Sequence, residues 1–128
     1  MEKLNNVKFD EKQIFEAVKI AYAAIEDKMG DEVIVLDISS VSILSDYFLI
    51  GSANNSNQLK AMAEFVQEKV ESLGMVARHV EGAQSARWIL IDFGYFTVHL
   101  FCKEEREYYR LEKIWGDARH VEHEELIS

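Results

Sequence analysis

Residues 49–65, LIGSANNSNQLKAMAEF, pass from an apolar segment through small polar residues into a helical pattern, and such junctions often bind phosphates. Loops that hold phosphates need several glycines, because backbone amides must approach the anion closely. Gly51 is the only glycine in this stretch, Lys60 lies inside the helical pattern, and no G-x-x-x-x-G-K-S/T motif is present. Asn55 is an ordinary helix-capping residue. The residues therefore favour a structural turn over a nucleotide-binding loop.

A glycine-serine pair between a strand and a helix also occurs in nucleotidyltransferases, which hold two divalent metals with paired carboxylates. That pair usually lies two residues apart on the next strand, and the corresponding segment here, MVARHVEG, contains no such pair. Asp37, Asp46 and Asp92 are scattered over separate segments, each near the end of an expected strand. Metal-dependent phosphoryl transfer is the weaker alternative, and we assign no catalytic, cofactor-binding or metal-binding residue.

Histidine and glutamate also occur together near the end of the chain. His120, Glu122 and His123 are residue types that bind zinc, but the segment that carries them is short and acidic. We expect residues 119–128 to form a frayed or loosely packed tail, which offers a metal no fixed geometry. Residues 1–118 are expected to form a single domain.

Composition limits the classes of function. The 128-residue chain has a formal net charge of −9, which opposes binding to nucleic-acid phosphates and favours a basic protein as partner. Cys102 is the only cysteine, so no intrachain disulfide can form and the reducing cytoplasm is the expected compartment. The charged amino-terminal stretch does not have the pattern of a secretory signal, and no apolar run is long enough to span a membrane.

Hydrophobic periodicity predicts the elements that hold these residues. Asp10 and Gln13 have the spacing of a capping box at the start of a helix, and Asn55 and Gln58 have the same spacing before a second helix. We expect an α/β or α+β domain with one mixed sheet of about five strands and three main helices. The expected strands are 32–38, 46–52, 75–82, 88–93 and 96–102, and the expected helices are 11–29, 56–73 and 104–116.

The segment RWILIDFGYFTVHLFC predicts a hairpin with a defined register. Gly94-Tyr95 can form a two-residue turn with glycine at its first central position, which places Phe93 opposite Phe96. Opposed residues share a face of the sheet, so one face is wholly apolar and must be core. The other face is mixed, and either helices bury it or it remains partly open as a protein-binding surface; it holds Trp88, Leu90, Asp92, Thr97, His99 and Phe101.

Several long segments resemble the ribosomal silencing factor family, also called the RsfS or Iojap-like family. The resemblance covers roughly residues 11–118. Its most specific part is the pattern W-x-L-x-D-x-G-x-x-x-V-H-x-F, which begins at Trp88 and is followed by R-x-x-Y-x-L-E-x-x-W from Arg106. The other matching segments are LDISSVSILSDYFLIGSANNSNQLKAMAEFV and VEG.

This resemblance implies an α/β fold with a nucleotidyltransferase-like layout that lacks the catalytic acids. It implies a protein that is not an enzyme and that binds the large ribosomal subunit through large-subunit ribosomal protein fourteen, a basic protein. Occupying that surface prevents the small subunit from joining and represses translation when nutrients are scarce. Organelle relatives act in large-subunit assembly.

The resemblance does not determine which residues contact the partner, so we predict them from the residue pattern. The aromatic face of the hairpin is expected to form the centre of the contact with acidic residues at its rim, and the last helix joins it where it flanks the same face. The alternatives are a nucleotidyltransferase-like enzyme and a homodimer formed through the same apolar surface. The predicted partner-binding residues are Trp88, Leu90, Asp92, His99, Tyr108, Glu112 and Trp115.

Overall fold

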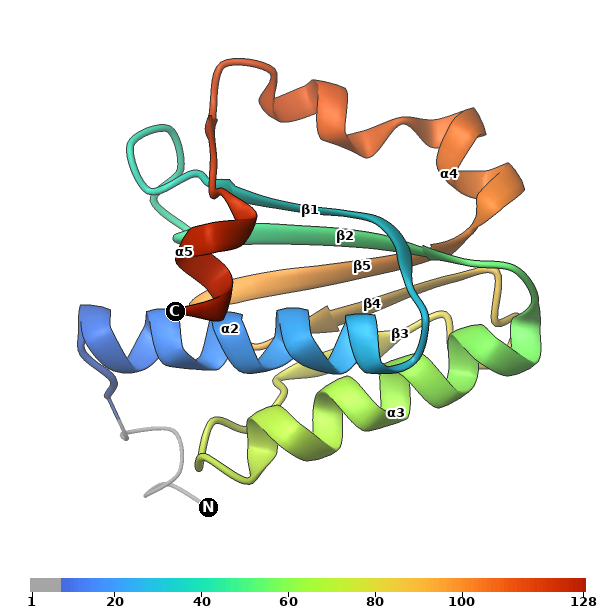
Figure 1. Cartoon of the computed structure of the whole chain (residues 1–128), viewed down its shortest axis with the longest axis horizontal. Helices are drawn as coiled ribbons and strands as arrows, with labels where there is room; N and C mark the ends of the chain where they lie inside the picture. The colour runs from blue at the N-terminus through green and yellow to red at the C-terminus, as the bar shows by residue number, and fades with distance from the viewer. Residues whose placement is uncertain (1–7) are drawn as a thin grey trace.

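The structure, a computed structural model, describes residues 8–128 and shows one mixed six-stranded sheet (Figure 1). The strand order is β3-β4-β5-β2-β1-β6, in which β2 and β5 are parallel and the other four neighbouring pairs are antiparallel. The predicted α/β class with one mixed sheet is confirmed, with one more strand than expected. The strands are β1 (Asp31–Asp37), β2 (Tyr47–Ala53), β3 (His79–Glu81), β4 (Trp88–Asp92), β5 (Phe96–Cys102) and β6 (Arg119–His120).

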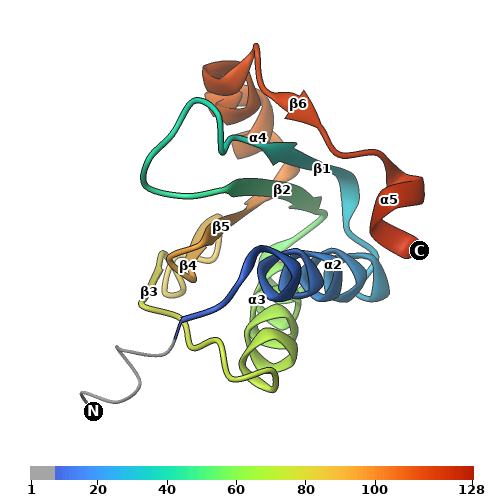
Figure 2. The same ribbon diagram turned by 90° about the vertical axis from the view of Figure 1, so that its left-hand side faces the viewer.

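Helices cover the two faces of the sheet unequally. The long helices α2 (Glu11–Asp27) and α3 (Ser56–Glu71) lie side by side across one face (Figures 1 and 2). Among residues 8–128, the helices on the opposite face are the short helix α4 (Lys103–Tyr109) and the 3₁₀ helix η1 (Leu111–Trp115). The main hydrophobic core lies under α2 and α3, and a smaller cluster, which includes Phe48 and Phe101, lies on the other face.

Both long helices begin at the predicted caps. The Asp10 carboxylate accepts a hydrogen bond from the Gln13 amide, and the Gln13 side chain accepts one from the Asp10 amide, which completes the capping box. The Asn55 side chain accepts a hydrogen bond from the Gln58 amide at 2.8 Å. Polar side chains thus satisfy backbone donors that the helix itself leaves free.

Gly51 and Ser52 belong to strand β2 and are buried. The glycine-serine pair that suggested a phosphate loop therefore lies inside the sheet. A Cβ at Gly51 would lie 3.1 Å from a side-chain carbon of Ile25, so glycine lets α2 pack closely on the strand. The Ser52 hydroxyl accepts a hydrogen bond of 2.8 Å from the Arg106 guanidinium. The predicted structural role of this segment agrees with the geometry.

The hairpin register is confirmed at every predicted pair. Trp88 lies opposite Phe101 and Leu90 opposite His99, and the Phe93 amide donates a hydrogen bond to the Phe96 carbonyl across the turn. Gly94 has φ +87°, a conformation that favours glycine. The predicted core face is buried, with exposures of 0–2%, at Ile89, Ile91, Phe93, Phe96, Val98 and Leu100.

The single helix expected over 104–116 is interrupted. Arg110 has φ +48°, which ends α4 at Tyr109 and turns the chain into η1. The turn brings Leu111 and Trp115 back over the sheet, where they pack against the cluster around Phe48. Burial of these apolar side chains offsets the cost of a left-handed residue.

The C-terminal segment is folded, so the expectation of a frayed tail is wrong. Strand β6 pairs with β1, and the short helix α5 (His123–Ile127) lies against α2 (Figure 1). Val121 and Leu126 are buried, and the Tyr22 hydroxyl shares a hydrogen bond of 2.6 Å with the His123 ring. Burial of two apolar side chains among acidic neighbours was enough to order the segment.

Residues 1–7, where the charged amino-terminal stretch begins, lie outside the described residues. None of the helices described is both long and apolar enough to cross a bilayer.

Leu126→Ala is expected to lower the free energy of unfolding by about 2–3 kcal/mol, because it removes a buried side chain and leaves a cavity. Ile127→Ala is the matched control, since Ile127 is 63% exposed, and it should change stability by less than about 0.5 kcal/mol. Urea unfolding measures both. Equal effects would show that the C-terminal helix is frayed in solution.

Candidate functional site

The face of the sheet opposite α2 and α3 contains a groove of about 530 Å³. One wall is the loop between β1 and β2, the other is η1, and the floor is formed by β2, β4 and β5. We call it the open-face groove, and its lining residues are Ile38, Ser42, Leu44, Ser45, Phe48, Arg78, Trp88, Asp92, Gly94, Thr97, His99, Leu111, Ile114 and Trp115.

Trp88 is half-buried at one end of this groove. Its ring stacks on Phe101 with 4.9 Å between centroids, and Tyr109 of α4 lies at the same centroid distance. Its indole N–H donates a hydrogen bond of 3.2 Å to Nδ1 of His99. The indole is thus neither a free surface group nor fully covered, and it forms a rigid, partly accessible wall.

His99 lies between Trp88 and Phe48 and is neutral at physiological pH. Burial lowers the pKa of His99 to about 4, and the Asp92 carboxylate opposes this shift only weakly. Because Nδ1 accepts the indole hydrogen bond, the ring proton resides on Nε2. The Phe48 ring lies 4.7 Å from the imidazole between centroids. The groove floor is therefore aromatic and uncharged at this point.

The structure brings four of the seven predicted partner-binding residues together. Trp88, Asp92, His99 and Trp115 line the open-face groove. Leu90 points to the same face of the sheet and is half-buried outside the groove lining. Tyr108, at 80% exposure, lies on α4 away from the groove lining.

Glu112, the seventh predicted residue, is occupied by an internal ion pair. Its carboxylate lies 3.6 Å from Arg106, whose side chain is 5% exposed. The same guanidinium donates hydrogen bonds to Ser52 and to the carbonyl of Glu32. One buried cation thus connects β1, β2, α4 and η1, and it fixes the position of one groove wall.

Sequence reasoning missed the exposed apolar side chains at the rim of the groove. Ile43 and Leu44, in the loop between β1 and β2, are 101% and 84% exposed, and Ile114 of η1 is 67% exposed. The signal was present in the segment SSVSILS, where apolar residues alternate with serines in an expected loop. Apolar side chains on a loop that is too far from the core to bury them indicate a contact surface.

Two of the three aspartates considered for metal binding, Asp37 and Asp92, accept local hydrogen bonds. Asp37 accepts a hydrogen bond of 2.6 Å from the Ser39 hydroxyl, and Asp92 accepts one of 2.7 Å from the Gly94 amide in the hairpin turn. Within residues 8–128, no three histidine, cysteine, aspartate or glutamate side chains gather closely enough to hold a metal ion.

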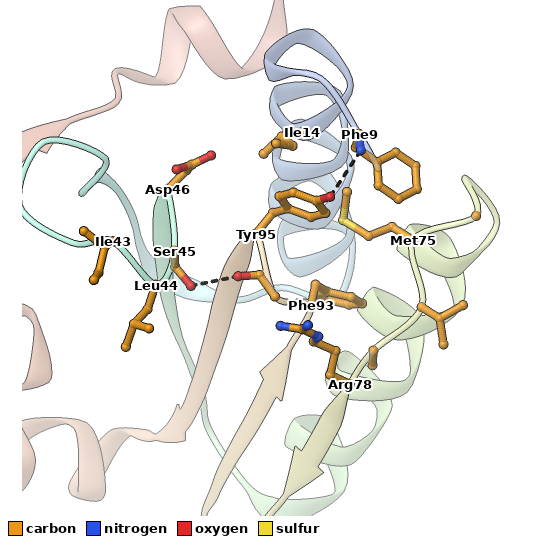
Figure 3. A pocket seen from close by; sticks show the side chains of 14 residues that line it. Phe9, Ile14, Ile43, Leu44, Ser45, Asp46, Met75, Arg78, Phe93 and Tyr95 are labelled. Carbon is orange, nitrogen blue, oxygen red and sulfur yellow. Dashed lines mark hydrogen bonds between the residues drawn. The ribbon is translucent and has the colours of Figure 1, made fainter. Parts of the chain in front are cut away.

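A second cavity, of about 760 Å³, lies beside the open-face groove (Figure 3). It contains none of the seven predicted residues, although it is the larger of the two. The two hollows share the ridge formed by Leu44, Ser45, Arg78 and Gly94, and the Ser45 hydroxyl donates a hydrogen bond of 3.0 Å to the Gly94 carbonyl there. The second cavity is therefore adjacent to the open-face groove, on the other side of this ridge.

A family model described as "Ribosomal silencing factor during starvation" matches residues 11–128. The chain belongs to this family. The match includes the C-terminal segment that packs on α2, and the family description is that of a regulatory protein.

Individual members of the ribosomal silencing factor family are similar over most of their length. RsfS of Halalkalibacterium halodurans is 41% identical over 113 residues, which cover 88% of this chain and 97% of that protein. RsfS of Bacillus subtilis is 43% identical over 101 residues, which cover 79% of this chain and 86% of that protein. A crystal structure of a protein from Chromobacterium violaceum gives a TM-score of 0.77 at 35% identity, and covers 79% of this chain and 84% of that one.

The lowered pKa of His99 predicts a specific dependence of stability on pH. Below pH 6.5 His99 becomes protonated in the unfolded chain, whereas in the folded chain it stays neutral down to about pH 4. The unfolded state therefore gains stability relative to the folded state as the pH falls from 6.5 to 4. The destabilisation caused by His99→Gln should therefore shrink by roughly 2 kcal/mol between pH 7 and pH 4.5. Urea unfolding at the two pH values measures it, and an NMR titration midpoint of the ring near 6.5 would contradict it.

Proposed function

We propose that this chain uses the open-face groove to bind the large ribosomal subunit and thereby blocks its association with the small subunit. The partner surface is large-subunit ribosomal protein fourteen, as the family resemblance implies. The observation that carries the proposal is the groove itself: an aromatic floor with exposed apolar side chains at its rim, on the face that α2 and α3 leave uncovered.

The chemistry of the groove fits a protein partner. Half-buried Trp88 and Trp115 supply large apolar area in rigid side chains, which are the usual anchors of protein interfaces. Leu44 and Ile114 stand on opposite walls and would exclude water around a bound side chain. The floor at His99 carries no charge at pH 7, so a partner group there meets no unpaired ion.

Charge favours a basic partner. The net charge of −9 attracts a basic ribosomal protein over long range and raises the rate of encounter, while it disfavours acidic competitors. The resulting mechanism is steric: the bound domain occupies a surface that the small subunit needs, and no bond is made or broken. Cytoplasmic translation falls because the two subunits cannot join.

Ile114→Glu is expected to abolish co-sedimentation with purified large subunits, because it places a charge at the apolar rim. Ile127→Glu is the matched control: the same residue type and substitution, with 63% exposure instead of 67%, on α5 outside the groove. Both variants should keep the wild-type melting temperature within a few degrees, since both sites are exposed. Wild-type binding by Ile114→Glu would reject the groove as the site.

Two alternatives give different results. A homodimer formed through the same rim would appear in light scattering of the wild-type chain and disappear in Ile114→Glu. If the rim serves only the dimer, the wild-type chain would not bind large ribosomal subunits. A nucleotide-transferring enzyme would bind nucleotide with magnesium in calorimetry. Inhibition of joining between separated subunits by the wild-type chain supports steric silencing over both.

A further inference from the structure

Asp46 lies at the rim of the second cavity, at the start of β2. Backbone hydrogen bonds hold the residue on both sides: its amide donates to the Tyr95 carbonyl at 2.7 Å, and its carbonyl accepts from the Ile38 amide at 2.8 Å. Figure 3 shows the Asp46 carboxylate apart from Arg78, which lines the same cavity from the segment before β3. The position of the acid is thus fixed by the sheet and the hairpin.

The carboxylate of Asp46 is half-buried and, within residues 8–128, lies within 4.0 Å of no basic side chain and accepts no hydrogen bond. Burial raises the pKa of Asp46, and the negative charges of Asp37 and Glu11 add to the shift. A half-buried anion in a negative field without a cation is unfavourable for the isolated fold. A carboxylate of this kind at the rim of a cavity is a candidate for binding a cation.

We propose that the second cavity receives a lysine or arginine side chain of the ribosomal partner, whose cationic end pairs with Asp46. The aliphatic stem of that side chain would lie on the apolar part of the lining, which includes Ile14, Ile43 and Tyr95. This inference rests on the proposed function and adds to it a second anchor with opposite chemistry: the open-face groove takes apolar groups, and the second cavity takes a basic one.

Proximity and charge both support this occupant. The second cavity and the open-face groove share Leu44, Ser45, Arg78 and Gly94 in their linings, so they are adjacent and one partner surface can contact both. Asp37 and Glu11 make the Asp46 end negative, which attracts a cation. Arg78 also lines the cavity, so a basic group would avoid the space beside its guanidinium and favour the carboxylate.

The test compares Asp46→Asn with Glu64→Gln in the full chain, by equilibrium binding to purified large subunits at two salt concentrations. Asp46→Asn should bind about tenfold more weakly, because it removes one close charge pair, and its affinity should depend less on salt. Glu64→Gln removes an exposed acid on α3, on the other side of the sheet, and should bind within about twofold of wild type.

Thermal unfolding of the same variants separates a binding role from a structural one. Because the fold disfavours the charged form of Asp46, Asp46→Asn should keep or raise the melting temperature while it weakens binding. Wild-type affinity in Asp46→Asn, together with loss of binding in Ile114→Glu, would overturn this inference and leave the proposed function standing. A wild-type chain that does not bind large subunits would overturn both.

Discussion

Gly94 turns the chain between β4 and β5, and the amide of Phe93 closes that turn on the carbonyl of Phe96. This single connection determines which residues of the two strands share a face. A slip of one residue would move every core side chain of the hairpin to the opposite face. The aromatic floor of the open-face groove therefore depends on the same register that fills the main core. The shape of the groove and the packing of the main core therefore both depend on this one strand pairing.

The open face remains accessible because the chain places little secondary structure over it. A buried guanidinium, that of Arg106, connects β1, β2 and η1, and the ion pair with Glu112 keeps η1 at the edge of the groove. Replacement of such a pair by apolar residues is often neutral for stability, but loss of one partner alone is costly. The position of the groove wall thus depends on a polar contact as well as on the apolar packing of Leu111 and Trp115.

The parts of the fold that local chemistry determines were predictable. The caps at Asp10 and Asn55 and the hairpin register each depend on residues within a few positions of one another. The left-handed turn at Arg110 and the packing of Leu126 on the body of the domain depend on contacts between distant segments, which periodicity does not report. For that reason the last helix was expected to be continuous and the C-terminal segment frayed.

In the candidate site, too, the features that depend on neighbouring residues were predicted and those that depend on distant contacts were not. Trp88, Asp92, His99 and Trp115 were predicted as partner-binding and line one groove. Strand alternation in the hairpin put the first three on one face, and the helical spacing of the last segment singled out Trp115. Glu112 looked like a rim acid, since no pattern in the sequence reveals that Arg106, six residues earlier, is buried beside it. Ile43 and Leu44 were overlooked because a loop offers no periodicity by which to judge whether an apolar side chain is buried.

Hydroxyl-radical footprinting of the chain, free and bound to large ribosomal subunits, tests the central claim directly. Leu44 and Ile114 are exposed at the rim of the open-face groove, while Met29 and Ile127 are comparably exposed elsewhere. Docking through the open face predicts that the subunit protects the first two side chains from oxidation and leaves the last two as reactive as in the free chain. Protection of Met29 and Ile127 without protection of the rim would contradict it.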